Sequence, residues 1–175
     1  MNHAKPIVER AAFIDAMRNV ASTVTVVTTD GPAGRAGLTL SAMCSLSADP
    51  PSVLVCIHRL SHVLQAIRVN KSFCVNLLGP EHLHIADVFA GRVAELRDDR
   101  FACATWTTGS SGAPVLAHGV AALDCELAEF KPFASHEIVI GRVLDVYNHQ
   151  RAPLLYMDRS YHSIGTRCDM PEPVA

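Results

Sequence analysis

Gly37-Leu-Thr-Leu-Ser-Ala-Met-Cys-Ser-Leu-Ser-Ala-Asp-Pro-Pro51 begins as a strand, because small or apolar residues alternate with polar ones. Four positions carry short hydroxyl groups, which can bond a ligand without filling the space that it needs: Thr39, Ser41, Ser45 and Ser47. The closing Asp-Pro-Pro ends the strand, since proline lacks an amide donor and restricts the residue before it.

The next run, Ser52 to His58, is apolar enough to be a strand that is buried on both faces. A hydroxyl-lined strand beside a buried one indicates a pocket wall for a polar, acceptor-rich ligand, such as a phosphate-bearing cofactor. The alternative is an edge strand whose polar face points to solvent. The segment taken alone leaves both interpretations open.

Composition limits the class of protein. A chain of 175 residues is most simply one domain. It is 49% hydrophobic and only 18% charged, so we expect part of its surface to be covered by another subunit. A net charge of −2 without a basic block argues against nucleic acid. No apolar run approaches the roughly 20 residues that span a bilayer, and the N-terminus lacks a signal peptide's apolar core, so we expect a cytoplasmic protein without membrane contact.

Cysteine and histidine do not form a metal or disulfide pattern. The six cysteines are scattered without a Cys-x-x-Cys pair, as expected for small buried hydrophobes: Cys44, Cys56, Cys74, Cys103, Cys125 and Cys168. His82 and His84 are the closest histidine pair in the sequence, and residues two apart on a helix point in different directions. We therefore expect neither disulfides nor a metal site.

Short strands separated by glycine and proline turns dominate the rest of the chain. We expect strands over 22–29, 53–58, 73–78, 114–116, 119–130, 138–147 and 154–156, and helices over 6–20, 61–69 and 81–90. The first helix has an apolar stripe for packing on the barrel, and the turn at 30–34 makes a hairpin of its flanking strands. Residues 91–111 are expected to form loops with a short helical turn, and 168–175 a loose tail. Many short strands with few helices favour a closed β-barrel.

Several motifs together resemble one family. Thr39-x-Ser41-Ala42, followed by Ser45-x-Ser47-x-Asp-Pro-Pro, resembles the flavin-binding segment of the small flavin reductases that accompany two-component monooxygenases. Further stretches resemble this family in the same order: Met17 to Thr29, Phe73-x-Val-Asn76-Leu, Arg100-Phe101, His136 with Gly141, and Tyr156-x-x-Arg159-x-Tyr161. The resemblance covers about 13–165. It implies a single flavin reductase-like domain over 1–175, mainly β, with a Greek-key split β-barrel, a few peripheral helices and a homodimer.

The same resemblance implies a flavin site. The flavin would lie along Thr39, Ser41, Ala42 and Met43, with Ser45 and Ser47 near the phosphate end. Cys56 and His58 would approach the flavin edge or ribityl chain. Ser61 and His62 would bind phosphate through a hydroxyl group and helix N-terminal amides. The alternative for Ser61 is a plain N-cap, and for Thr39 and Ser41 ordinary strand hydroxyls.

Other candidates surround this segment. The resemblance places Asn76 near the flavin, although an amide in an apolar strand can equally serve a structural hydrogen bond. Phe89, Arg92 and Arg100 are candidates for the cleft rim, where an arginine fork suits a phosphate; for each arginine the alternative is a solvated surface position. The closing aromatic segment would stack on a flavin or nicotinamide ring or pack a dimer interface: Tyr156, Arg159 and Tyr161.

His136 is the candidate catalytic residue. In the family, a Gly-Asp-His segment places its histidine near the nicotinamide; here Ser135 replaces the acidic residue, so the orientation of His136 stays open. The alternative is a turn histidine that only hydrogen-bonds its own loop.

The resemblance implies an oxidoreductase, an NAD(P)H-dependent flavin reductase that transfers hydride from NADH or NADPH to FMN or FAD and supplies a partner monooxygenase. Such an enzyme needs no nucleophile or acid–base pair, because the cofactors carry the electronic work. Two alternatives keep the barrel: a pyridoxamine-phosphate-oxidase-like enzyme with tightly held FMN, and a flavin- or haem-binding module without catalysis. FMN versus FAD and NADH versus NADPH stay open.

Overall fold

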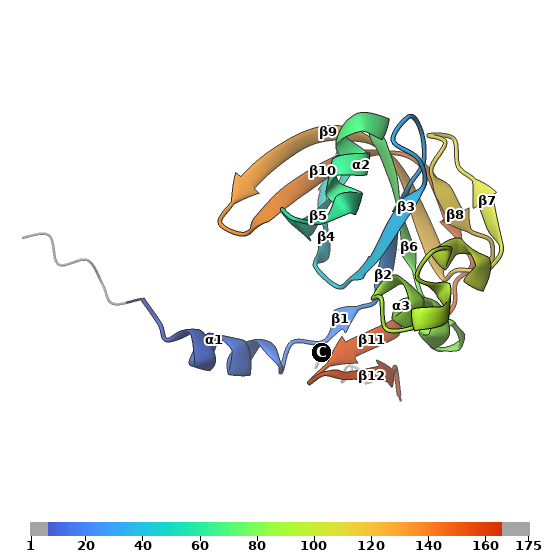
Figure 1. Ribbon diagram of the computed structural model, residues 1–175. Helices are drawn as coiled ribbons and strands as arrows, with labels where there is room; N and C mark the ends of the chain where they lie inside the picture. Colours follow the sequence, from blue (N-terminus) through green and yellow to red (C-terminus); the bar gives the residue numbers. More distant parts are fainter. Residues whose placement is uncertain (1–6, 166–175) are drawn as a thin grey trace, which may run out of the picture.

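The computed structural model describes residues 7–165, and its main feature is one curved antiparallel sheet (Figure 1). Seven strands follow one another across it in the order β3 (Ala36–Leu40), β2 (Thr25–Thr29), β6 (Ser72–Leu77), β9 (Ala121–Phe133), β10 (His136–Asn148), β5 (Pro51–His58) and β4 (Met43–Ala48). The edge strands β3 and β4 do not pair with each other, so the barrel is split. The prediction of a mainly β, split-barrel fold is confirmed, whereas the closed barrel that the many short strands favoured is wrong, because these two edges stay unpaired.

The two edges of the sheet are consecutive in sequence. β3 ends at Leu40 and β4 begins at Met43, so only Ser41 and Ala42 carry the chain across the split. We predicted that one strand continues through this region, and that prediction was wrong. The hydroxyl-bearing positions are therefore divided between opposite edges of the sheet, and only β4 lies beside β5.

Two small sheets complete the β structure. β1 (Ser22–Thr23), β11 (Leu154–Met157) and β12 (Ser160–Ser163) form one of them, and β7 (Trp106–Thr108) pairs with β8 (Pro114–Leu116) in the other. β12 was not predicted, because its four residues contain no buried side chain and hence no apolar alternation.

One helix fills the split in the barrel, and another covers one end. α2 (His62–Asn70) buries Val63, Leu64 and Ile67 as predicted. These side chains pack with Val27 of β2 and Val55 of β5, so α2 fills the interior between the two sides of the split. A second cluster forms around α3 (Leu83–Phe89), which follows the 3₁₀ turn η1 (Pro80–His82). Two further 3₁₀ turns, η2 (Ala94–Leu96) and η3 (Arg100–Cys103), lie in the predicted loop region.

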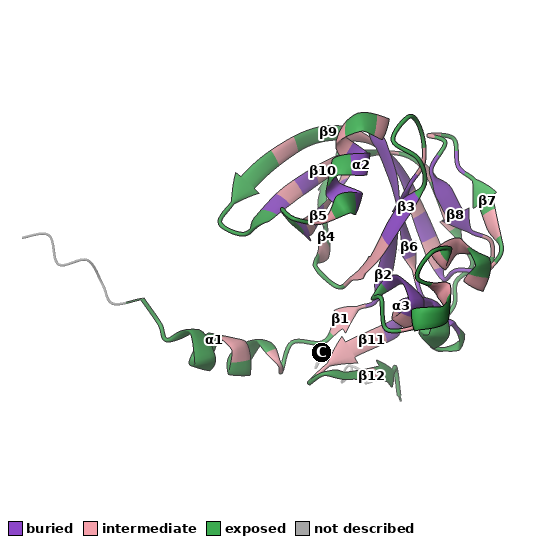
Figure 2. Ribbon diagram, viewed as in Figure 1, coloured by how far each residue is buried: buried purple, intermediate pink, exposed green. Residues whose placement is uncertain are grey.

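The first helix is shorter than predicted and does not pack on the barrel. α1 (Arg10–Met17) contains no buried residue and extends away from the sheet (Figures 1 and 2). Phe13 and Met17, which we predicted to face the barrel, are 56% and 48% exposed. Pro6, the predicted start of this helix, lies outside the described residues, as do Cys168 and the predicted tail 168–175.

Burial of β5 also differs from the prediction. Val53, Val55 and Ile57 point into the barrel and are buried, while Leu54 and Cys56 alternate with them and are only half-buried (Figure 2). The strand is therefore buried on one face, because its other face lies on the outside of a single curved sheet. Apolar side chains on that outer face remain partly open to solvent in one copy of the chain.

The threonine-rich strand β2 shows how polar residues enter the core. All five of its residues are buried. The hydroxyl of Thr25 donates to the carbonyl oxygen of Leu40 at 2.9 Å, and that of Thr29 donates to Ser72 at 2.7 Å. Each hydroxyl thus meets an acceptor, so burial of the β-branched side chain leaves no polar group unpaired.

In the described part of the chain, no helix is long and apolar enough to cross a membrane. The five cysteines within it carry free thiols, and no group of three potential metal ligands gathers there.

Candidate functional site

Strand β3 runs past two cavities, which define the candidate site. The first, here called the basic cavity, has a volume of about 360 Å³ and is lined by Arg35, Ala36, Gly37, His62, Arg97, Asp98, Asp99, Arg100 and Phe101. The second, here called the tyrosine cavity, has a volume of about 180 Å³ and is lined by Val24, Thr39, Leu40, Ser41, Arg92, Tyr156 and Tyr161. Gly37 lies at one and Ser41 at the other, about 13 Å apart at a rise of roughly 3.3 Å per strand residue.

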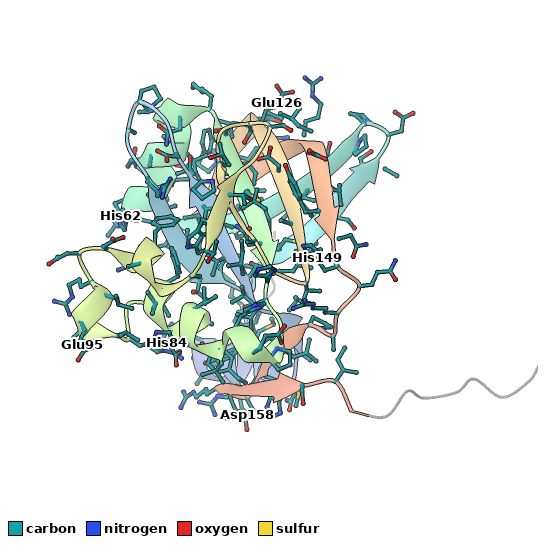
Figure 3. All side chains as sticks on the ribbon, turned by 90° about the vertical axis from the view of Figure 1, so that its right-hand side faces the viewer. His62, His84, Glu95, Glu126, His149 and Asp158 are labelled. Atoms are coloured by element: carbon teal, nitrogen blue, oxygen red, sulfur yellow. The ribbon has the colours of Figure 1, made fainter. Side chains whose placement is uncertain are left out.

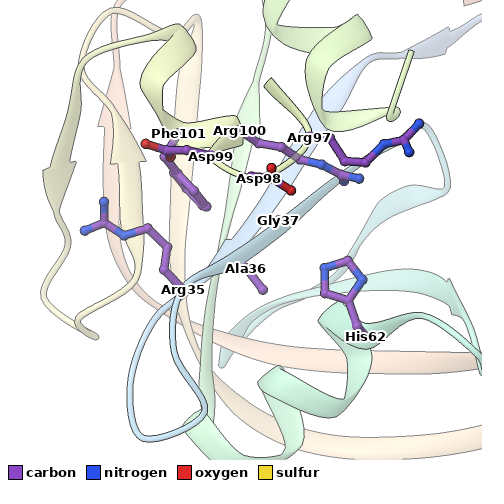
Figure 4. A pocket seen from close by; sticks show the side chains of 9 residues that line it. All are labelled: Arg35, Ala36, Gly37, His62, Arg97, Asp98, Asp99, Arg100 and Phe101. Carbon is purple, nitrogen blue, oxygen red and sulfur yellow. The ribbon is translucent and has the colours of Figure 1, made fainter. Parts of the chain in front are cut away.

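The basic cavity brings cationic groups to the start of α2. His62 and the η2–η3 region, which carries Glu95, lie on the same side of the molecule (Figure 3). The side chains of Arg97 and Arg100 lie opposite His62, and Asp98 lies between them (Figure 4). Ser61 occupies the N-cap position of α2 but makes no side-chain cap hydrogen bond. First-turn amides and guanidinium groups together favour an anionic group such as phosphate.

Arg35 and Gly37 shape this cavity, but neither offers a ligand an unpaired charge. Arg35 pairs with Asp30 at 3.0 Å and lies over the Phe101 ring at 5.1 Å. Gly37 cannot carry a side chain, because an added Cβ would lie 2.6 Å from a ring carbon of Phe89. The glycine therefore lets α3 approach β3 closely.

The tyrosine cavity combines aromatic rings with one cation. The rings of Tyr156 and Tyr161 meet edge to face at 5.5 Å between centroids. Arg92 is the cationic residue of this lining. The hydroxyl of Thr39 donates to the carbonyl of Ala86 at 2.7 Å, so towards a ligand it offers only an acceptor. Planar rings and a guanidinium group suit a flat, electron-accepting heterocycle.

A third cavity continues from the tyrosine cavity towards α1. Its volume is about 290 Å³, and Ser41 and Tyr156 line both spaces. Arg159 joins them here, beside Met17 and Arg18 of the α1 region. The structure thus brings Thr39, Ser41, Arg92, Tyr156, Tyr161 and Arg159 together, while His62 and Arg100 lie at the other end of β3.

Two candidate residues belong to the core, and their predicted roles in cofactor binding need correction. Asn76 is fully buried; its amide nitrogen donates to the carbonyl of Val26 and the hydroxyl of Thr28, and its oxygen accepts from the Leu116 amide at 2.7 Å. These bonds use both the nitrogen and the oxygen of the amide, so Asn76 has the structural role that was the alternative to cofactor binding. Phe89 is 2% exposed and packs against Phe101 and Trp106 instead of lining a cleft rim.

The residues of β4, and Ala42 just before it, lie apart from the basic cavity. Met43 is half-buried and packs against the barrel interior, and Ala42 is exposed. Ser45 is exposed, and Ser47 forms a local turn in which its hydroxyl donates to the Asp49 carbonyl at 2.8 Å. Neither serine lines the basic cavity, so the prediction that they mark the phosphate end is not supported by this arrangement.

His136 lies at the start of β10, paired in register with His58. The two imidazole rings meet edge to face at 5.2 Å, and Nδ1 of His136 lies 2.9 Å from the Ser135 hydroxyl. The backbone amide of Leu60 donates to Nδ1 of His58 at 3.2 Å, which leaves Nε2 as the protonated nitrogen of a neutral ring. Next in the chain, buried Glu137 forms ion pairs with Arg59 and Arg68.

These contacts hold His136 in place but do not bring it into the three cavities above. Cys56 lies on the same outer face as His58, two residues before it, and burial is the main cause of its raised thiol pKa. A raised pKa keeps the thiol protonated near neutral pH, so Cys56 has little nucleophilic character.

Sequence reasoning missed three residues of this region: Arg35, Arg97 and Asp87. Arg97 stands three residues before Arg100, and a charge cluster in 97–100 was visible in the sequence. Asp87 gave no such signal. The Tyr161 hydroxyl, which donates a hydrogen bond to Asp87, is 74 residues away, and no local pattern connects the two residues.

Comparisons with known proteins agree with this architecture. A family model described as a flavin reductase like domain matches residues 17–165. The FMN reductase (NADH) RutF of Serratia proteamaculans is 39% identical over 160 residues, which cover 91% of this chain and 90% of that protein. Among solved structures, the NADH:FAD oxidoreductase SgcE6 of Streptomyces globisporus, in complex with NAD and FAD fragments, has a TM-score of 0.84 at 26% identity and covers 95% of this chain and 100% of its own.

BorF, the flavin reductase component of a bacterial two-component tryptophan halogenase, has a TM-score of 0.78 at 25% identity. The alignment covers 91% of this chain and 100% of BorF.

Proposed function

This chain belongs to the flavin reductase-like domain family, and from that premise we propose that it transfers a hydride from NADH to FMN and releases the reduced flavin to a partner oxygenase. The names of the relatives support FMN and NADH as the pair used here. BorF is the reductase component of a two-component halogenase, which supports a separate enzyme as the recipient of reduced flavin.

One observation carries the proposal: β3 connects a basic cavity to an aromatic one. A flavin mononucleotide has the same order of groups, a phosphate at one end and a planar ring at the other. The phosphate would lie at His62 and Arg100, and the ring at Thr39, Ser41 and the tyrosine cavity. Arg92 lies where it can stabilise negative charge that develops on the ring.

The chemistry asks little of the protein's side chains. A bound flavin accepts the hydride at its own ring, so the chain has to orient two rings at reacting distance and exclude water. Tyr156 and Tyr161, whose rings are inclined at 65° to each other, supply aromatic surface in the cavity for this purpose.

A time course of NADH absorbance tests the function. Rapid loss of NADH is expected only when protein and FMN are both present, and repeats with FAD and NADPH rank the cofactors. Absence of acceleration over free FMN would remove the proposal. A purified yellow protein that stays oxidised under NADH would instead support a binding module or an enzyme with tightly held FMN.

For the hydride donor we propose contact with His136. His136→Ala is expected to raise KM for NADH about fivefold, because one imidazole contact is worth roughly 1 kcal/mol, and to leave the dissociation constant of FMN unchanged. Steady-state kinetics and FMN fluorescence quenching measure the two quantities. An unchanged KM for NADH and an unchanged rate would mean that His136 only hydrogen-bonds its own loop.

We also propose that two copies pair. α1 carries exposed Phe13 and Met17, and the outer face of β5 leaves Leu54 and Cys56 half-buried. Burial of such side chains against a second copy is favourable at about 25 cal/mol per Å² of apolar area. Light scattering is expected to give twice the chain mass of 18.9 kDa. A mass of one chain at micromolar concentration would contradict the pairing.

A further inference from the structure

A carboxylate lies directly behind the tyrosine cavity. Oδ1 of Asp87, on α3, accepts a hydrogen bond from the Tyr161 hydroxyl at 3.0 Å and another from Nη1 of Arg92 at 2.9 Å. Nη1 of Arg92 also donates to the Tyr161 oxygen at 3.2 Å. Three side chains from α3, the loop after it and β12 thus form a closed triangle, and Asp87 is the member that does not line the cavity.

These contacts decide what the two cavity residues can offer a ligand. The single hydrogen of the Tyr161 hydroxyl goes to Asp87 and one oxygen lone pair accepts from Arg92, whose Cζ also lies 5.8 Å from the ring centroid, so the second lone pair and the ring face away from Arg92 remain. Arg92 uses Nη1 for Asp87 and Tyr161, and a guanidinium group has donors on its other nitrogens as well. The triangle therefore fixes one side of Arg92 and leaves donors for the cavity.

Arg92 is otherwise poorly held. Its side chain is 53% exposed, whereas that of Asp87 is 27% exposed. Its ion pair with Asp87, as an exposed contact, adds little to the stability of the fold. Its backbone amide bonds the Asp87 carbonyl at 2.9 Å, so the main chain already sets the distance between the two residues. What the Asp87 carboxylate adds is the direction in which the guanidinium group points.

We propose that Asp87 is a positioning residue for flavin reduction, which holds Arg92 and Tyr161 at the ring end of the site without touching the flavin. This inference rests on the proposed function. Negative charge that develops on the reduced ring is stabilised most by a cation that is already in place, because a preorganised group needs no rearrangement during the reaction. Without Asp87, Arg92 would turn towards solvent and Tyr161 would lose its anchor.

The test is a cycle of variants. Asp87→Ala is expected to lower kcat with NADH and FMN about tenfold, with KM for NADH within twofold. In a background that carries Arg92→Ala and Tyr161→Phe, the same change is expected to lower kcat less than twofold, because Asp87 then has nothing left to position. Glu81→Gln is the matched control, because Glu81 in η1 also pairs with an arginine, Arg151 at 3.3 Å, but lies outside the cavities.

The outcomes of this cycle show whether Asp87 acts through Arg92 and Tyr161. An equal loss of kcat in both backgrounds would overturn the inference, since Asp87 would then act on the fold and not through its partners. If Asp87→Ala fails to fold, Asp87→Asn removes the charge with the same shape and runs through the same cycle. If the unaltered protein oxidises no NADH with FMN, the proposed function fails, and the FMN dissociation constants of the same variants decide separately whether Asp87 acts through Arg92 and Tyr161.

Discussion

Arg100→Ala is expected to raise the dissociation constant of FMN about 30-fold and to leave that of riboflavin within twofold. Arg100 lines the basic cavity opposite His62, and its guanidinium group also donates to the Phe89 carbonyl at 3.3 Å, which holds it there. A charge-assisted hydrogen bond contributes about 1.5 to 3 kcal/mol, or roughly 10- to 150-fold in affinity. Riboflavin lacks the phosphate and so loses nothing when this arginine is removed.

Fluorescence quenching of the two flavins measures both constants. Arg151→Ala is the matched control, because this arginine also donates to a backbone carbonyl, that of His118 at 3.4 Å, but lies outside the three cavities. Equal weakening of FMN and riboflavin would show that Arg100 supports the cavity wall and not the phosphate. Raised salt should weaken FMN binding in the unaltered protein and have little effect on Arg100→Ala.

The second large effect concerns stability. Gly141→Ala is expected to lower the free energy of unfolding by about 3 kcal/mol, because the new methyl group has no space in the core. An added Cβ would lie 2.4 Å and 2.8 Å from two ring carbons of Phe73, and 2.9 Å from Cβ of Cys125. Phe73 and Cys125 are both fully buried, so neither can move aside.

Urea denaturation followed by circular dichroism gives this difference. Gly165→Ala serves as control, since nothing lies within 4 Å of an added Cβ at that position. A loss below 1 kcal/mol would mean that Phe73 finds another rotamer. Gly141 belongs to the segment that resembles flavin reductases, and the structure gives it a packing role between β10 and β6.

Much of the fold could be predicted from local patterns. The threonine- and valine-rich run 22–29, the turn after it and the Gly37 strand form the expected hairpin, with Val27 opposite Leu38. The stripe of Val63, Leu64 and Ile67 faces the core because helical spacing places these residues on one side. Patterns of this kind depend only on neighbours within one turn or one strand.

The errors arose where distant segments meet. Asn76 finds Pro114, Leu116 and Val26 as partners 38 to 50 residues away, so its apolar neighbours in sequence gave no sign of them. The alternation of apolar and polar residues continues through Ser41 and Ala42, so it gave no sign of the break between β3 and β4. That break arises because the sheet curls. For the site, the pattern of hydroxyl residues correctly indicated β3. The triangle of Asp87, Arg92 and Tyr161 could not be predicted from the sequence, because only the folded chain brings Tyr161 to the other two residues.

The link of Ser41 and Ala42 between the two edge strands also limits how the split can widen. Leu40 and Met43 are three residues apart in sequence, so their Cα atoms can never separate by more than about 11 Å. Within residues 7–165, no comparable tether joins the strands at the opposite end, where β3 begins beside the basic cavity and α2 fills the gap. Any widening of the split is therefore limited most at Ser41 and Ala42. The tether thus fixes the width of the split at its ring end more tightly than at its basic end.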